Sequence, residues 1–160
     1  MKLRGTIAKG LARAVAKGFT HVDARGRPVQ AAAMPWRRRG DGDIEILLVT
    51  GRRGRRWIVP KGWPMRGRSL AEAAAQEAWE EAGVRGRVAP RPIGRFRHHK
   101  RHRLLGPTEF IVLLFPLEVE SEAQSWPERD QRARRWCRRR DAAEAVASPA
   151  LAKLVRGFSP

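Results

Sequence analysis

Residues 62–84 read GWPMRGRSLAEAAAQEAWEEAGV, and this stretch carries the clearest helix signal in the chain. Residues 70–82 are rich in alanine and glutamate, which both favour helices. Ser69 precedes them and Glu72 follows three residues later, the capping-box pattern of a helix start. Gly83 stands where a helix commonly ends in a left-handed residue. The stretch therefore predicts a helix over 70–82 with a loop on each side.

This helix would carry Glu77, Glu80 and Glu81 on one side, because positions i, i+3 and i+4 are neighbours on a helix surface. Like charges repel there, and the helix macrodipole disfavours anions in the last turns. The protein has a formal net charge of +18, so basic residues are not scarce. Two interpretations remain open. The carboxylates hold a divalent cation such as Mg²⁺, or they form a solvated acidic face that nearby arginines offset.

The sequence on either side of this helix predicts strands. The run IEILLVT (44–50) is β-branched and aliphatic, and TEFIVLLFPLEVE (108–120) is the strongest strand signal. Further strands are expected over 29–37 with an interruption near Pro35, over 57–60 and over 133–137, and one or two helices within 141–157. This order predicts an α/β fold with a mixed β-sheet and helices on both of its sides.

Length and charge limit the class of protein. A chain of 160 residues suffices for one domain, expected over 25–160, after a basic N-terminal extension over 1–24. Lys and Arg number 34 against 16 for Asp and Glu, which favours a polyanionic partner. That partner is a phosphate-rich small molecule or RNA. The oligomeric state is left open.

Cys137 is the only cysteine, which excludes an internal disulfide framework and a zinc site built on a cysteine cluster. A reducing, cytoplasmic setting is expected. His98, His99 and His102 lie among basic residues that would repel a transition metal. The longest apolar run, 111–117, is too short for a transmembrane segment.

The spacing of glycines and glutamates in 62–84 resembles the Nudix box, a loop–helix–loop catalytic motif. The matching motif residues are Gly62, Glu77, Glu80, Glu81 and Gly83, closed by Val84. Arg68 and Gln76 depart from the family pattern, which has a glutamate and an arginine there that brace the loop against the helix. The resemblance implies a Nudix-type α/β/α sandwich with a mixed β-sheet. The chain is similar to the branch that hydrolyses diphosphoinositol polyphosphates and dinucleoside polyphosphates such as diadenosine polyphosphates.

The resemblance also implies a chemistry: hydrolysis of a phosphoanhydride by a metal-activated water, with Mg²⁺ as cofactor and Mn²⁺ as its substitute. Glu77 and Glu81 are the implied metal ligands, and a backbone carbonyl of Lys61 or Gly62 completes the set. Glu80 is a third ligand or the general base. The implied catalytic residues are therefore Glu80 and Glu77.

Basic residues on two loops are expected to hold the remaining phosphates of the substrate. These substrate-binding residues are Arg52, Arg53, Arg55, Lys61, Lys100, His102 and Arg103. Glu109 and Glu120 are reserve general bases. Trp63 and Phe96 either stack on a base or sugar or pack within the protein. The alternative function is a basic RNA-binding or RNA-end-processing Nudix domain with weak or lost catalysis.

Overall fold

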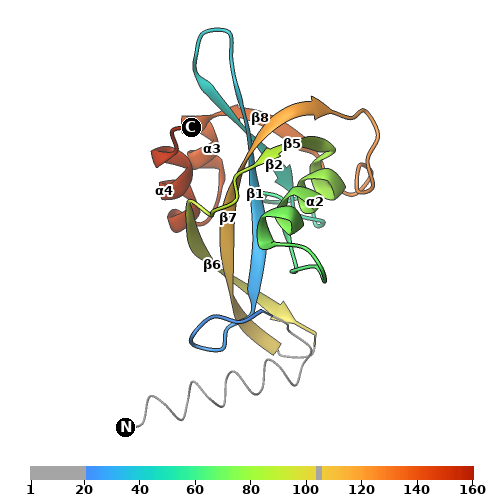
Figure 1. Cartoon of the computed structure of the whole chain (residues 1–160), viewed down its shortest axis with the longest axis vertical. Coiled ribbons are helices and arrows are strands. Elements are labelled where there is room, and N and C mark those ends of the chain that lie inside the picture. The colour runs from blue at the N-terminus through green and yellow to red at the C-terminus, as the bar shows by residue number, and fades with distance from the viewer. Residues whose placement is uncertain (1–20, 104–105) are drawn as a thin grey trace.

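The computed structural model describes residues 21–103 and 106–160, apart from the side chain of His102; most of the expected N-terminal extension lies outside this part. Eight strands form one sheet, with α2 on one face and α3 and α4 on the other (Figure 1). No helix in the described ranges is long and apolar enough to cross a membrane. The elements are β1 (Val29–Arg38), β2 (Ile44–Thr50), β3 (Trp57–Ile58), β4 (Lys61–Gly62), α2 (Leu70–Ala82), β5 (Val84–Val88), β6 (Gly94–His102), β7 (Gly106–Glu122), β8 (Arg134–Arg138), α3 (Arg139–Ala145) and α4 (Pro149–Gly157).

The strand β7 organises the sheet. It is 17 residues long and pairs with β1, β5 and β6. Its pairing with β1 is parallel, whereas the remaining strand pairs are antiparallel. The mixed sheet expected from the sequence is therefore confirmed.

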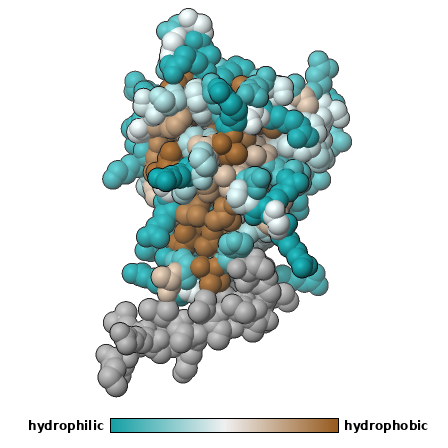
Figure 2. All heavy atoms as spheres, in the orientation of Figure 1, coloured by the Kyte–Doolittle hydropathy of each residue, from teal (hydrophilic) through white to brown (hydrophobic). Residues whose placement is uncertain are grey.

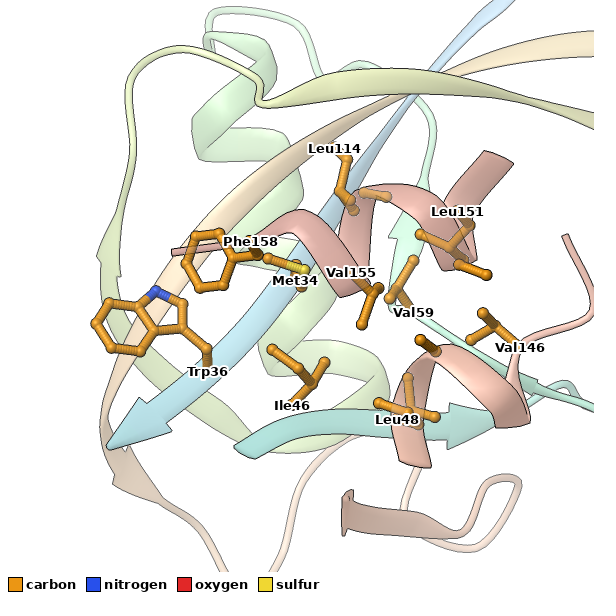
Figure 3. Close-up of a cluster of buried hydrophobic side chains, with 14 of the residues drawn as sticks. Met34, Trp36, Ile46, Leu48, Val59, Leu114, Val146, Leu151, Val155 and Phe158 are labelled. Carbon is orange, nitrogen blue, oxygen red and sulfur yellow. The ribbon is translucent and has the colours of Figure 1, made fainter. Parts of the chain in front are cut away.

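The two faces of the sheet bury two separate hydrophobic clusters, because successive side chains of a strand point to opposite faces. Ala32 and Met34 of β1 face α3 and α4, where Figure 3 shows Met34, Leu114 and Val155 directed into one cluster. Ala31 and Ala33 face α2 and pack against its alanines. These small side chains let the helix lie close to the strand, and the α/β/α arrangement is confirmed.

β1 runs without a break through Pro35, so the expected interruption is wrong. Alternate nitrogens of a strand point to one side, so the nitrogen of Pro35 faces the same side as the N–H of Ala33, which donates to the Pro60 carbonyl at 2.9 Å. On that side β1 pairs with β4 at residues 31–32 and with β2 only from residue 36. Pro35, which has no backbone N–H to donate, thus lies at the point where β1 changes its partner strand from β4 to β2. No hydrogen bond between strands is lost there.

The strand expected over 57–60 is wrong in its limits, because Pro60 separates two short strands. β3 pairs with β2, and β4 pairs with β1. This switch carries the chain across the sheet and brings Lys61 and Gly62 beside α2. The glycine that begins the motif is therefore placed at an edge of the sheet, facing the helix.

Candidate active site

Local sequence signals set both ends of α2. Ser69 and Glu72 form the full capping box: the Ser69 side chain accepts from the Glu72 N–H, and the Glu72 carboxylate accepts from the Ser69 N–H. Gly83 ends the helix with φ of 66°, in the left-handed region. A Cβ at Gly83 would also lie 2.7 Å from the Trp126 ring, so glycine is required there for two reasons. The expected helix over 70–82 is confirmed.

The carbonyls at the C-terminal end of α2 are capped by a segment that comes more than forty residues later in the sequence. The backbone N–H of Glu128 donates to the Glu80 carbonyl at 3.0 Å, and the Trp126 indole N–H donates to the Glu81 carbonyl at 3.2 Å. The Arg134 guanidinium donates to the Ala82 carbonyl at 2.7 Å. Arg134 therefore supplies the positive charge that the end of a helix favours, which the helix's own last turn lacks.

Glu81 is buried and paired with an arginine. Its side chain is 6% exposed, and Arg132, 8% exposed, lies 2.8 Å from its Oε1. Its Oε2 accepts from the Lys61 N–H at 3.3 Å. Arg132 also contacts Glu128 at 2.5 Å and donates to the Thr50 carbonyl at 2.9 Å. For Glu81, then, an arginine offsets the charge, although the carboxylate is not solvated.

Glu77 lies against Gly62, where a Cβ would overlap its carboxylate. Burial, followed by the charges of Glu81 and Glu80, raises the pKa of Glu77 to about 7. Burial also raises the pKa of Glu81 to about 7, in spite of Arg132 and Lys61. Two adjacent carboxylates that resist ionisation are a natural site for an added cation, whose charge would favour their ionised forms. Their hard oxygen ligands fit Mg²⁺ or Mn²⁺ in type.

Glu80 is close enough for its charge to act on Glu77, but one of its oxygens has a partner outside the pair. Its Oε1 accepts from the Gln76 side-chain amide at 2.7 Å. Within residues 21–103 and 106–160, no three acidic, histidine or cysteine side chains gather in a way that could hold a metal ion. The structure thus brings Glu77 and Glu81 together and turns Glu80 toward Gln76.

Two of the expected substrate-binding residues, Lys61 and Arg52, lie around this pair, and a third, Lys100, lies near Lys61. Burial lowers the pKa of Lys61, which also lies within electrostatic range of Glu81 and Lys100. Arg52 pairs with Glu128 at 2.9 Å and lies within range of Glu81 and Glu77. The remaining expected residues, Arg53, Arg55 and Arg103, are exposed on turns, and the side chain of His102 lies outside the described part.

The reserve bases lie in other contacts. Glu109 pairs with Arg27 at 2.5 Å and with His99 at 3.1 Å. His99 and Glu109 are opposite each other in the β6–β7 register, on the face away from His98. Glu120 lies 3.3 Å from Arg87. The partners of Glu109 and Glu120 in these ion pairs are thus Arg27, His99 and Arg87, and none of them is an α2 carboxylate.

His98 is half-buried and near the site. Burial, together with the charges of Lys61 and Lys100, lowers the pKa of His98 to about 4. It is therefore neutral at physiological pH and adds no positive charge beside the two lysines. A neutral imidazole there can donate or accept a hydrogen bond.

A cavity of about 550 Å³ lies between β6 and the start of α4. Figure 2 shows hydrophobic side chains gathered over β6 and β7 and bordered by hydrophilic ones. Phe96 lines this cavity but is only 5% exposed and belongs to the core, which favours packing over stacking on a ligand. Arg27 also lines it, and its charge is offset by Asp23 and Glu109. The cavity is therefore less basic than its arginines suggest.

Without divalent cations, Glu77→Gln is expected to raise the Tm at pH 8 by about 2–6 °C and to leave it unchanged at pH 5. A carboxyl whose pKa is raised from 4.5 to about 7 is protonated in the folded state at pH 5 and charged at pH 8. Its contribution to stability is thus lost as the pH rises from 4.5 through 7. Thermal unfolding at both pH values measures this, with the exposed Glu144→Gln as control. An equal shift at both pH values would contradict it.

Comparison with protein-family models matches residues 27–158 to the NUDIX domain. Among curated proteins, Nudix hydrolase 4 of Arabidopsis thaliana is 35% identical over 116 residues, covering 72% of this chain and 54% of that protein. Nudix hydrolase 21, chloroplastic, of the same plant is 30% identical and covers 77% of this chain and 61% of that protein. The chain thus spans between half and two thirds of the length of these plant relatives.

A third relative matches over most of both chains. Diphosphoinositol polyphosphate phosphohydrolase 3-beta of Bos taurus is 30% identical over 149 residues, covering 86% of this chain and 84% of that protein. Among solved structures, an Ap4A hydrolase of C. elegans superposes with a TM-score of 0.57 at 21% identity, covering 80% of this chain and 92% of that chain. At this identity the structural likeness concerns the fold.

Proposed function

The chain belongs to the Nudix hydrolase family, and we propose that it is a metal-dependent pyrophosphohydrolase. Its substrate would be a nucleoside polyphosphate, a dinucleoside polyphosphate or a diphosphoinositol polyphosphate, in which it would cleave a phosphoanhydride bond. The observation that carries this proposal is the pair Glu77 and Glu81 beside Gly62, with Lys61 close by. Carboxylates suit a cation, and a lysine beside them suits phosphate oxygens.

Nudix hydrolases generally use divalent metals. We assign Glu77 and Glu81 to hold Mg²⁺, with Mn²⁺ as substitute, helped by a carbonyl of Lys61 or Gly62. When bound, the ion screens the charge of phosphate oxygens and acidifies a water molecule. Gln76 occupies Oε1 of Glu80, so Oε2 is the oxygen that we assign to accept a proton from the attacking water. As the water oxygen forms its bond to the attacked phosphorus, the bond from that phosphorus to the bridging oxygen would break, and the bridging oxygen would leave with the other phosphate.

The side chains around the carboxylates have separate tasks in this proposal. Lys61 and Lys100 lie close enough for their charges to interact, and both would bind phosphate oxygens near the bond that breaks. Arg52 is 67% exposed and would bind the more distant phosphates after leaving Glu128. Arg53, Arg55 and Arg103, which lie on exposed turns, would add attraction over a longer range.

The proposal is tested by a phosphohydrolase screen. Dinucleoside polyphosphates, nucleotide sugars, nucleoside triphosphates and inositol pyrophosphates are each incubated with Mg²⁺, with Mn²⁺ or with a chelator. We expect metal-dependent hydrolysis of at least one polyphosphate class and none with the chelator. No hydrolysis of any class with either metal would overturn the proposal.

The exposed ring of Trp63 offers a way to separate the substrate classes. Trp63 is 37% exposed, and its ring packs edge-on against Phe110 at 5.3 Å. Phe110 lies opposite His98 in the β6–β7 register, and the charge of Lys61 acts on His98. A base that stacks on Trp63 would leave its phosphates within reach of the lysines.

Trp63→Ala is therefore expected to raise the KM for dinucleoside polyphosphates by about tenfold, since stacking on one base is worth about 1–3 kcal/mol. Inositol pyrophosphates have no base, and their KM should not change. Trp63→Phe keeps an aromatic face and serves as the control. An equal rise in KM for both substrate classes would indicate that Trp63 has only a packing role.

We also propose a cytoplasmic setting. Cys137 is buried on β8 and is the only cysteine of the sequence, so the fold needs no oxidising compartment. Fractionation of the source cells, followed by immunoblotting, tests this.

A further inference from the structure

The two residues that depart from the family pattern contact each other. The Arg68 guanidinium donates to Oε1 of Gln76 at 3.3 Å. The Nε2 amide of Gln76 donates to Oε1 of Glu80 at 2.7 Å. Arg68 lies in the loop before α2, whereas Gln76 and Glu80 are one helical turn apart within it. The three side chains therefore form one chain of hydrogen bonds from the loop to Glu80.

This chain has a definite polarity. The Gln76 amide has an acceptor at one end and a donor at the other, and it lies between a cation and an anion. The guanidinium and the carboxylate both favour the same orientation of the amide, and such aligned hydrogen bonds strengthen one another. An acid at position 68 would instead compete with Glu80 for the Gln76 donor. A cation at position 76 would face Arg68.

Glu80 is held next to the carboxylates of the candidate metal site. Its charge acts on Glu77, so the two side chains are close. A small change in the direction of Glu80 would therefore alter the field at Glu77 and the reach of its own free oxygen. Because Gln76 donates to the Glu80 carboxylate, its amide sets that direction.

We propose that Gln76, anchored by Arg68, is a positioning residue that fixes the orientation of the Glu80 carboxylate beside the Glu77–Glu81 pair. The proposal rests on the proposed hydrolase function. Arg68 and Gln76 then form one unit that replaces the glutamate and arginine of the family pattern. A change at one position is compensated by a matching change at the other.

Gln76→Glu separates positioning from simple bracing. The new carboxylate keeps the Arg68 anchor as an ion pair, but it places a like charge beside Glu80. We expect kcat on the best substrate of the screen to fall by about tenfold, with KM unchanged and the Tm preserved. A purely structural brace predicts unchanged kcat as long as the Tm is preserved. Parental kcat would therefore overturn the proposal.

A charge exchange gives the second test. Arg68→Glu and Gln76→Arg are each expected to lower kcat by about tenfold, and the double variant R68E/Q76R to recover to within about threefold of the parent. The dissociation constant of Mn²⁺, measured by calorimetry, is expected to change and recover in the same pattern. Additive effects in the double variant would overturn the proposal.

The failure of this inference is distinguishable from failure of the proposed function. If the parent protein hydrolyses nothing in the screen, the proposed function fails, and the Mn²⁺ dissociation constants then decide the inference alone. A dissociation constant that is the same for parent, single variants and double variant would overturn it. Thermal unfolding of each variant identifies any that do not fold.

Discussion

Replacing Arg132 by alanine is expected to lower the free energy of unfolding by about 3–5 kcal/mol at pH 8, because removing one partner of a buried ion pair leaves an uncompensated charge. The Arg132 side chain is 8% exposed and the Glu81 side chain 6% exposed, so water cannot readily replace the guanidinium. The Thr50 carbonyl and the Glu128 carboxylate lose a donor in the same change.

Urea unfolding at pH 8 without metal measures this effect. The matched control is Arg140→Ala, because Arg140 is 87% exposed and pairs with Glu144 across one turn of α3; surface pairs of this kind contribute about 0–1 kcal/mol. Arg132→Lys keeps the positive charge but lacks the several N–H donors of a guanidinium. Its loss of unfolding free energy should lie between those of Arg132→Ala and Arg140→Ala. A loss below about 1 kcal/mol for Arg132→Ala would show that the pair contributes little.

Replacing Glu77 by glutamine has the largest effect that we expect on activity. It should lower kcat by about 10³-fold, because a catalytic cation contributes several kcal/mol and each 1.4 kcal/mol is about a factor of ten. The amide removes a negative ligand from the cation but changes the shape of the side chain little. Activity is measured with saturating Mg²⁺, and cation affinity by calorimetry with Mn²⁺.

Loss of activity in this variant cannot be attributed to unfolding, since the same change should raise the Tm of the metal-free protein at pH 8. Glu144→Gln, an equal change at an exposed position of α3, controls for the general effect of removing a carboxylate. Activity within tenfold of the parent would show that Glu77 is not a ligand of the catalytic cation.

Local sequence signals were sufficient for the loop–helix–loop motif. The capping box, the alanine-rich helix and the glycine after it each act over a few residues, and the structure has all three. Strands with continuous aliphatic runs, β2 and β7, were also predictable, because burial on both faces favours such sequences. The interruption expected at Pro35 is wrong, since the tolerance of a strand for proline depends on its neighbours in the sheet.

The surroundings of the carboxylates were not predictable in the same way. The groups that cap α2 or pair with its glutamates come from the loop before β8 and from the first residue of that strand: Trp126, Glu128, Arg132 and Arg134. In a chain with 34 basic residues, nothing local distinguishes Arg132 from the exposed arginines. A signal did exist in the helix itself: its last turn contains no basic residue, so a distant one had to supply the charge.

The structure bears on both interpretations of the acidic cluster. Arg132 offsets part of the charge of Glu81, as the arginine interpretation requires, yet burial still raises the pKa of this carboxyl to about 7. Within the part of the chain that the structure describes, Glu77 forms no ion pair with a guanidinium, and its pKa is raised. A bound cation would favour the ionised form of this carboxylate and so lower its pKa. Glu80 takes a neutral partner, Gln76. Three adjacent glutamates on one helix thus have three different electrostatic environments, which spacing alone does not reveal.

The distant capping of α2 has a consequence for how the protein matures during translation. A nascent chain that has emerged as far as Val84 contains every residue of the Nudix box, yet none of the groups that bind the carbonyls of Glu80, Glu81 and Ala82. Those groups emerge only with residues 126–134, so the box cannot reach its final form before that segment has left the ribosome. Until then, these carbonyls lack the partners that the folded protein gives them.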